Sequence, residues 1–216
     1  MQGTRFLTQA VACQPHRTAT IYGERRRTWT EVGARVPRLA AALRGLGIAD
    51  GAFVAALAMN SDRYIELFFA VPWAGGAFAP LNIRWSLAEN AYALTDSKSS
   101  VLFVDESFLD QARELKRQLA WLKTLVWMGE GDAPEGTLAY EELIERHAPM
   151  TSSAGSARVS RTKRWMWRIR STGSFSATGA AYCDPANLLP PIGSSLVRRL
   201  IGKPTGISAT ATPISS

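Results

Sequence analysis

Hydrophobic and polar positions follow two alternating patterns along the first 150 residues. Short, nearly continuous apolar runs occupy residues 52–59, 77–81, 100–105 and 124–128, as expected for strands that are buried on both faces. Between these runs, apolar residues recur every three or four positions, which indicates helices. The alternation of strand and helix predicts an α/β fold with a mainly parallel sheet and helices on both faces.

The segment before the first buried strand begins with a short amphipathic helix at residues 4–14. A β-type run at residues 18–22, a turn at 23–27 and a returning strand at 28–30 then predict a hairpin.

The next expected helix starts at Thr30 or Glu31 and carries an apolar face as far as Leu46. Gly47 is placed to cap it in the left-handed conformation, and Pro37 inside it is expected to weaken or kink it. Its arginines fall largely on the opposite face, where a solvated surface is the simplest interpretation: Arg35, Arg38 and Arg44.

Four further helices are expected, at residues 62–73, 86–95, 108–122 and 138–147. Ser61 is a suitable N-cap for the first of them, and the spacing of Ser86 and Glu89 fits a capping box for the second. The helix at 62–73 is apolar nearly all round, so we expect other elements to cover it.

Charge divides the chain into two parts near residue 150. Residues 151–216 contain 9 Lys and Arg against 1 acidic residue, a net charge of +8, whereas residues 1–150 hold 16 basic and 17 acidic residues. We therefore assign residues 1–150 to a folded domain. Residues 151–216 contain five prolines and few periodic apolar positions, which predicts a basic, disordered tail.

The scattered cysteines and histidines give no sign of a metal or catalytic site. Cys13 and Cys183 lie far apart and are interpreted as reduced thiols, and His16 and His147 lie beside or near prolines, in expected surface loops. The sequence shows neither a signal peptide nor an apolar run long enough for a membrane span. We therefore expect a cytoplasmic protein.

A set of short motifs follows in a fixed order through the same region. They are Arg27-Thr-Trp-Thr-Glu31, Arg38-Leu-Ala-Ala-Ala-Leu43, Gly47, Gly51, Val54-Ala-Ala-Leu57, Asn60-Ser61, Tyr64-Ile-Glu66, Gly75-Gly76, Pro80-Leu81-Asn82, Glu89, Asp96-Ser97 and Leu102-Phe103-Val104-Asp105. Together they resemble the opening part of the acyl-CoA synthetases, the AMP-dependent synthetase and ligase family of adenylate-forming enzymes. The resemblance covers roughly residues 4–148 and implies a partial N-terminal domain of the adenylate-forming fold.

The resemblance also implies a chemistry. Members of this family use ATP and Mg²⁺ to convert a carboxylic acid, here a fatty or aromatic one, into an acyl-adenylate. They then pass the acyl group to coenzyme A. Adenylation supplies the leaving group that a carboxylate lacks, and the developing charge on the phosphates needs cationic and amide donors.

The parts of the family that grip the nucleotide are not intact here. A Ser/Thr/Gly-rich loop ending in Lys-Gly is expected soon after Pro149. The segment found, Arg170-Ser-Thr-Gly-Ser-Phe-Ser-Ala-Thr-Gly-Ala-Ala181, has alanines where the Lys is needed. We therefore assign no catalytic, cofactor-binding or metal-binding residue, and we expect neither ATP, Mg²⁺ nor coenzyme A to bind productively to this chain.

The composition of the tail suggests a change of reading frame. Trp165, Met166 and Trp167 have single codons, TGG, ATG and TGG. If Arg168 uses a CGN codon, reading two bases later gives Asp-Val-Ala, which resembles the acidic stretch before the family's phosphate loop. We therefore hypothesise a frame shift between about residues 150 and 165.

Our main interpretation is an inactive fragment of an acyl-CoA synthetase. One alternative is a nucleic-acid-binding protein that uses its basic Arg/Trp tail, although such a tail would also attract polyanions without specificity. Another is a non-catalytic interaction module in which the helix at 62–73 meets a partner. If that helix stays uncovered, we expect the protein to be marginally stable or prone to aggregation.

Overall fold

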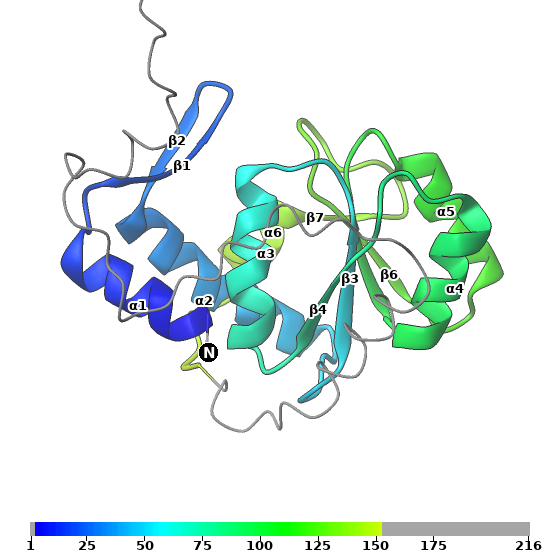
Figure 1. Cartoon of the computed structure of the whole chain (residues 1–216), viewed down its shortest axis with the longest axis horizontal. Helices are drawn as coiled ribbons and strands as arrows, with labels where there is room; N and C mark the ends of the chain where they lie inside the picture. The colour runs from blue at the N-terminus through cyan, green and yellow to red at the C-terminus, as the bar shows by residue number, and fades with distance from the viewer. Residues whose placement is uncertain (1–2, 153–216) are drawn as a thin grey trace, which may run out of the picture. The chain divides into compact units, whose positions relative to one another are not determined.

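The computed structural model describes residues 3–152, which form a β-hairpin and a five-stranded sheet with helices packed around it (Figure 1). In chain order the elements are α1 (Gly3–Cys13), β1 (Thr18–Tyr22), β2 (Arg25–Thr28), α2 (Trp29–Gly45), β3 (Phe53–Leu57), α3 (Asp62–Trp73), β4 (Ala77–Pro80), α4 (Leu87–Ser97), β5 (Val101–Val104), α5 (Leu109–Gln118), β6 (Thr124–Trp127), β7 (Leu138–Ala139) and α6 (Tyr140–Arg146). The predictions made for the tail, namely its disorder, Cys183 and the segment 170–181, lie outside the described residues.

The sheet has the strand order β4-β3-β5-β6-β7, and every neighbouring pair in it is parallel. This confirms the α/β fold with a parallel sheet that the sequence pattern predicts. The hairpin forms a separate antiparallel pair in which Tyr22 lies opposite Arg25.

Alternate residues of the strands enter two separate cores. On β3, Val54 and Ala56 pack with α2, α3 and α6, whereas Ala55 and Leu57 pack with α4 and α5. Side chains of successive strand residues point to opposite faces, so the two cores cover the two faces of the sheet (Figure 1).

Side-chain caps set the starts of the helices. The N–H of Thr28 donates to the Glu31 carboxylate at 2.6 Å, and the Thr28 hydroxyl accepts from the Glu31 N–H. This capping box starts α2 at Trp29, slightly before the predicted start at Thr30 or Glu31. The predicted caps at Ser61 and Ser86 are confirmed, as is the left-handed conformation of Gly47, whose φ is +83°.

Two helix boundaries predicted from the sequence are wrong. Helix α5 ends at Gln118, before the predicted end at Leu122. The final helix starts at Tyr140, because Leu138 and Ala139 pair with β6 as the short strand β7.

The prediction that other elements cover α3 is correct only in part. Ile65 and Phe68 are 41% and 48% exposed, while Asp62, Arg63 and Glu66 on the same helix are buried. The outward stripe of α3 is therefore apolar, and its charges face inward.

Strand β4 forms one edge of the sheet within residues 3–152, since it pairs only with β3. Its residue Phe78 packs against Tyr64 and against Phe68, with ring centroids 5.6 and 4.9 Å apart. The open edge of β4 thus adjoins the apolar stripe of α3.

Candidate functional site

The strand order creates a topological switch point between β3 and β5. The chain passes from β3 through α3 to β4 on one side, and returns through α4 to β5 on the other. Helices α3 and α4 pack on opposite faces of the sheet (Figure 1). In open parallel sheets ligands bind beyond the carboxyl ends of the strands at such a point, so this is the first candidate for a binding site.

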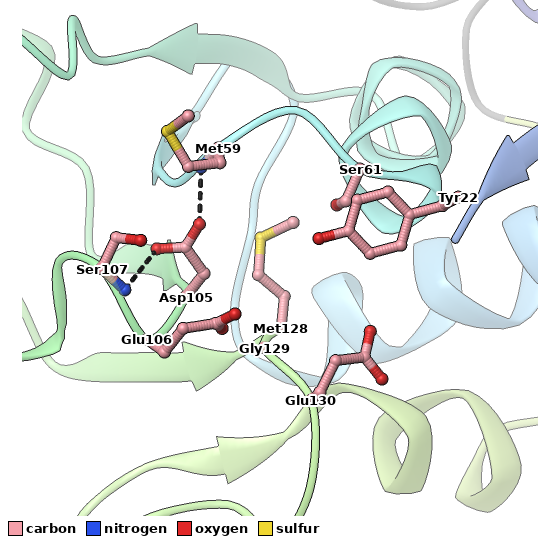
Figure 2. A pocket seen from close by; sticks show the side chains of 9 residues that line it. All are labelled: Tyr22, Met59, Ser61, Asp105, Glu106, Ser107, Met128, Gly129 and Glu130. Atoms are coloured by element: carbon pink, nitrogen blue, oxygen red, sulfur yellow. Dashed lines mark hydrogen bonds between the residues drawn. The ribbon is translucent and has the colours of Figure 1, made fainter. Parts of the chain in front are cut away.

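A small hollow of about 90 Å³, open to solvent, lies beyond these strand ends. Figure 2 shows its lining, which comes from the segments that follow β3, β5 and β6 and from the end of β1. The lining residues are Tyr22, Met59, Ser61, Asp105, Glu106, Ser107, Met128, Gly129 and Glu130.

Asp105 joins the segments that follow β3 and β5. Its carboxylate accepts hydrogen bonds from the backbone N–H of Met59 at 2.5 Å and of Ser107 at 3.1 Å (Figure 2). Burial raises the pKa of Asp105 and outweighs these two hydrogen bonds, which act in the opposite direction. Because both carboxylate oxygens accept backbone donors, Asp105 fixes the shape of the hollow.

Arg25 of the hairpin binds two carboxylates at the rim of the hollow. Its Nε and one terminal nitrogen donate to Asp62 at 2.7 and 3.0 Å, and its two terminal nitrogens donate to Glu130 at 2.8 and 3.2 Å. Each carboxylate is held by two hydrogen bonds, an arrangement that the planar guanidinium favours. Arg25 therefore ties the hairpin to both α3 and the segment after β6.

A second arginine, Arg63 of α3, holds the same segment from inside. Its guanidinium donates to the carbonyl oxygens of Met128, at 3.0 Å, and Gly129, and also to Glu141 at 3.0 Å. The position of the residues after β6 thus depends on charged groups from β2, α3 and α6.

Glu66 lies at the buried centre of this network. It accepts hydrogen bonds from Arg35 and from the hydroxyl of Tyr140, both at 2.7 Å, and its side chain is fully buried. Arg35 also donates twice to Glu141, so the prediction that Arg35 lies on a solvated surface is wrong. We use the name buried ion network for Arg25, Arg27, Arg35, Asp62, Arg63, Glu66, Glu130 and Glu141.

The carboxylates of the network have depressed pKa values. Burial raises the pKa of Asp62 and of Glu141, but hydrogen bonds and charges from the arginines outweigh burial and hold both pKa values below the usual range. The hydrogen bond from Arg25 lowers the pKa of Glu130. At neutral pH these three groups are therefore ionised partners of the arginines.

The hollow is poorly suited to phosphate groups. Asp105, Glu106 and Glu130 line it, and none of the lining residues is Lys, Arg or His. The nearby guanidinium groups of Arg25 and Arg63 already bind carboxylates. Stabilising a reacting phosphate requires cationic or amide donors aimed at its oxygens, so the lining does not fit the nucleotide of an adenylate-forming enzyme.

The candidate metal ligands among the described residues do not come together in the structure. Within residues 3–152, no group of three or more His, Cys, Asp or Glu is arranged to hold a metal ion. His16 and Cys13 are exposed, and His147 lies at the end of α6 with its Nδ1 2.8 Å from the carbonyl oxygen of Leu143. No helix in this part of the chain combines the length and apolar character needed to cross a bilayer.

The motifs that resemble the family turn out to hold the structure together. Ser61 caps α3, Glu89 completes the capping box of α4, and Asp105 joins two segments of the hollow. Sequence reasoning missed the buried ion network, although charged residues within the apolar helix α3 were a signal for it.

Comparison with known proteins identifies the relatives of this domain. Benzoate–CoA ligase of Arabidopsis thaliana, a peroxisomal protein, is 36% identical over an aligned length of 156 residues that covers 68% of this chain and 27% of that protein. Indoleacetate–CoA ligase of Aromatoleum aromaticum is 33% identical over 147 residues, 68% of this chain and 28% of that protein. The crystal structure of an anthranilate CoA ligase with anthranoyl-AMP matches with a TM-score of 0.67 and 25% identity, over 71% of this chain and 30% of that one.

These similarities place the α/β domain in the class of acyl-activating CoA ligases. Residues 7–165 match the family described as AMP-binding enzyme. The chain therefore belongs to the AMP-binding enzyme family, as its motifs suggest, and it spans little more than a quarter of the length of the curated relatives compared.

Proposed function

We propose that this chain carries the N-terminal portion of an AMP-forming acid–CoA ligase. The observation that supports this is the family match over residues 7–165, with relatives that are ligases of benzoate and of indoleacetate. The parent reaction joins a carboxylic acid to ATP and then transfers the acyl group to coenzyme A. An aromatic acid is the substrate class that these relatives favour.

We further propose that the 216 residues alone do not catalyse this reaction. The segment 170–181 has Ala180 and Ala181 where the family's phosphate loop has Lys-Gly. The hollow at the switch point presents carboxylates instead of cations. The chain thus supplies a scaffold for the parent reaction without the groups that stabilise the phosphates.

The test is carboxylate-dependent exchange of labelled pyrophosphate into ATP. The purified chain is assayed with benzoate and indoleacetate, beside the Arabidopsis benzoate–CoA ligase as a positive control. We expect exchange only with the control. Exchange by this chain that depends on either acid would overturn the proposal that it is inactive.

The coding DNA provides a separate test of the frame-shift hypothesis. A Ser/Thr/Gly-rich segment ending in Lys-Gly in another frame, downstream of the codon for Met150, is the expected result. If no frame contains such a segment, the hypothesis is wrong. The nucleic-acid and interaction-module alternatives remain predictions, and the first of them depends on residues outside the described part.

A further inference from the structure

The β1–β2 hairpin is attached to the rest of the domain mainly by charge. None of the residues in its two strands is buried, and no backbone hydrogen bond between described residues joins residues 18–28 to the five-stranded sheet or to α3. Apolar packing is confined to the base, where Ala19 and Trp29 touch the core. At the tip, Ile21 is 60% exposed. The base of the hairpin is thus anchored by apolar packing, whereas its tip must be held by other contacts.

Arg25, which lies next to the wall of the hollow, provides these contacts. In the hairpin register it lies opposite Tyr22, and its guanidinium stacks over the Tyr22 ring at 5.6 Å from the centroid. Tyr22 lines the hollow together with Glu130 and Met128 (Figure 2). The contacts of Arg25 with Asp62 and Glu130 therefore hold Tyr22 in the wall of the hollow.

We propose that the β1–β2 hairpin is a strap over the switch-point hollow. Two bidentate ion pairs of Arg25, one with Asp62 and one with Glu130, hold it closed, and we call each of these pairs a fork. Breaking or screening these forks releases the tip of the hairpin and opens the hollow on the side of Tyr22. The base stays in place, because Arg27 independently contacts Asp62 at 3.1 Å and Glu66 at 3.4 Å. Because the hollow is already open to solvent elsewhere, the strap controls only how wide it is on the side of Tyr22.

The two forks differ in their exposure to solvent. The Asp62 side chain is fully buried, whereas that of Glu130 is 56% exposed. Salt screens exposed pairs more than buried ones. Salt should therefore weaken the fork with Glu130 first, while the fork with Asp62 persists.

Met128 provides a direct measure of opening. It lines the hollow but is only 3% exposed, whereas Met59, which lines the same hollow, is 49% exposed. Hydrogen peroxide oxidises accessible methionines to the sulfoxide. The rate at Met128, followed by mass spectrometry, reports on the strap, and the rate at Met59 serves as an internal reference.

The variant that tests the strap is Arg25→Gln, with Arg26→Gln as the matched control. Arg26 lies next to Arg25 on β2 but is exposed, and no ion pair joins it to another described residue. We expect Arg25→Gln to oxidise at Met128 about tenfold faster than the parent chain, which corresponds to opening of the strap made easier by about 1.4 kcal/mol. Arg26→Gln is expected to match the parent chain.

A second variant separates opening of the strap from general unfolding. Glu130→Gln keeps one acceptor oxygen but removes the negative charge that faces Arg25 and, at 3.4 Å, Arg63, so we expect a smaller acceleration at Met128 that responds less to salt. Asp62 keeps its ion pair with Arg27 in both variants, so we expect amide hydrogen exchange in β3, β5 and β6 to stay unchanged. Equal Met128 rates in the parent chain, Arg25→Gln and Glu130→Gln would overturn the proposal. Accelerated exchange throughout the sheet would also overturn it, because it would show that the forks support the whole domain.

Discussion

Helices α3 and α5 lie on opposite faces of one sheet and are built in opposite ways. Helix α5 follows the usual rule: it buries Ala112 and Leu115 and turns its charged residues to solvent. Helix α3 buries Asp62, Arg63 and Glu66 and exposes Ile65 and Phe68. One face of the sheet is thus covered mainly by apolar packing, and the other combines apolar packing with the buried ion network.

This difference affects how each face responds to substitution. An apolar core loses transfer energy and packing when a side chain is shortened. A buried ion pair contributes little net stability compared with an apolar replacement, but removing one partner leaves a charge buried without compensation. The face with α3 should therefore be far more sensitive to the loss of single charges.

The largest expected effect comes from Glu66→Ala. This change leaves Arg35 without one buried partner and removes the shorter of the two hydrogen bonds of the Tyr140 hydroxyl, so we expect the free energy of unfolding to fall by about 3–5 kcal/mol. Urea denaturation followed by circular dichroism measures it.

Leu115→Ala on α5 is the matched change on the other face, with an expected loss of roughly 2–5 kcal/mol. Because the two sites share no partner, their effects should add within about 0.5 kcal/mol. Glu66→Ala and Arg35→Ala, in contrast, should cost much less together than the sum of their separate effects. Full additivity of this second pair would show that the network does not act as a unit.

An intermediate effect is expected from acid. The pKa values of Asp62, Glu130 and Glu141 are lowered in the fold. Their contribution to stability is therefore complete above the pKa values of the unfolded chain, near pH 4, and is lost as the pH falls through the lower values of the folded chain. The groups facing them from neighbouring elements are the arginines of β2, α2 and α3: Arg25, Arg27, Arg35 and Arg63.

Thermal unfolding between pH 3 and pH 7 measures this dependence. We expect the midpoint to fall below about pH 4, and Arg25→Gln to weaken the fall, because Asp62 and Glu130 then lose a partner that holds their pKa values down. Asp105 acts in the opposite direction, since its raised pKa means that its ionisation costs stability as the pH rises. If the midpoint of Arg25→Gln fell as steeply with acid as that of the parent chain, the ion pairs of Arg25 with Asp62 and Glu130 would not be the cause of the acid dependence.

The smallest effect on folding is expected from Phe68→Ser on the exposed stripe of α3. Phe68 is 48% exposed but packs against Phe78, so we expect stability to fall by about 1–2 kcal/mol. Association between molecules should fall, because exposed apolar surface promotes it. Sedimentation over a range of concentrations measures this, with Tyr92→Ser as the control, since Tyr92 is 67% exposed on α4. Equal association of both variants would contradict a special role for the stripe.

The sequence pattern was sufficient for four strands of the sheet, β3 to β6, but insufficient for the charges. Continuous apolar runs and the capping residues Ser61 and Ser86 are local signals, and they predicted the parallel strands and the helix starts. Strand β7 was missed because its two residues, Leu138 and Ala139, carry no period of their own. A two-residue strand becomes visible only once β6 lies beside it.

The buried ion network could not be found from spacing. Arg35 meets Glu66 across 31 positions and Glu141 across 106, so no helical or strand period connects them. An arginine opposite an apolar helix face is ordinarily solvated, and only the fold shows that its carboxylate partners are inside. The hollow could not be predicted from the sequence for the same reason, because its lining comes from four separate segments of the chain.

The edge strand β4 gives the sheet a direction in which it can be extended. The opposite edge is the two-residue strand β7, which offers few backbone groups for pairing. A further strand added beside β4 would lie next to Phe78 and cover part of the surface now shared with Phe68. The added strand would then pair with the backbone of β4 and bury these aromatic rings in a single step.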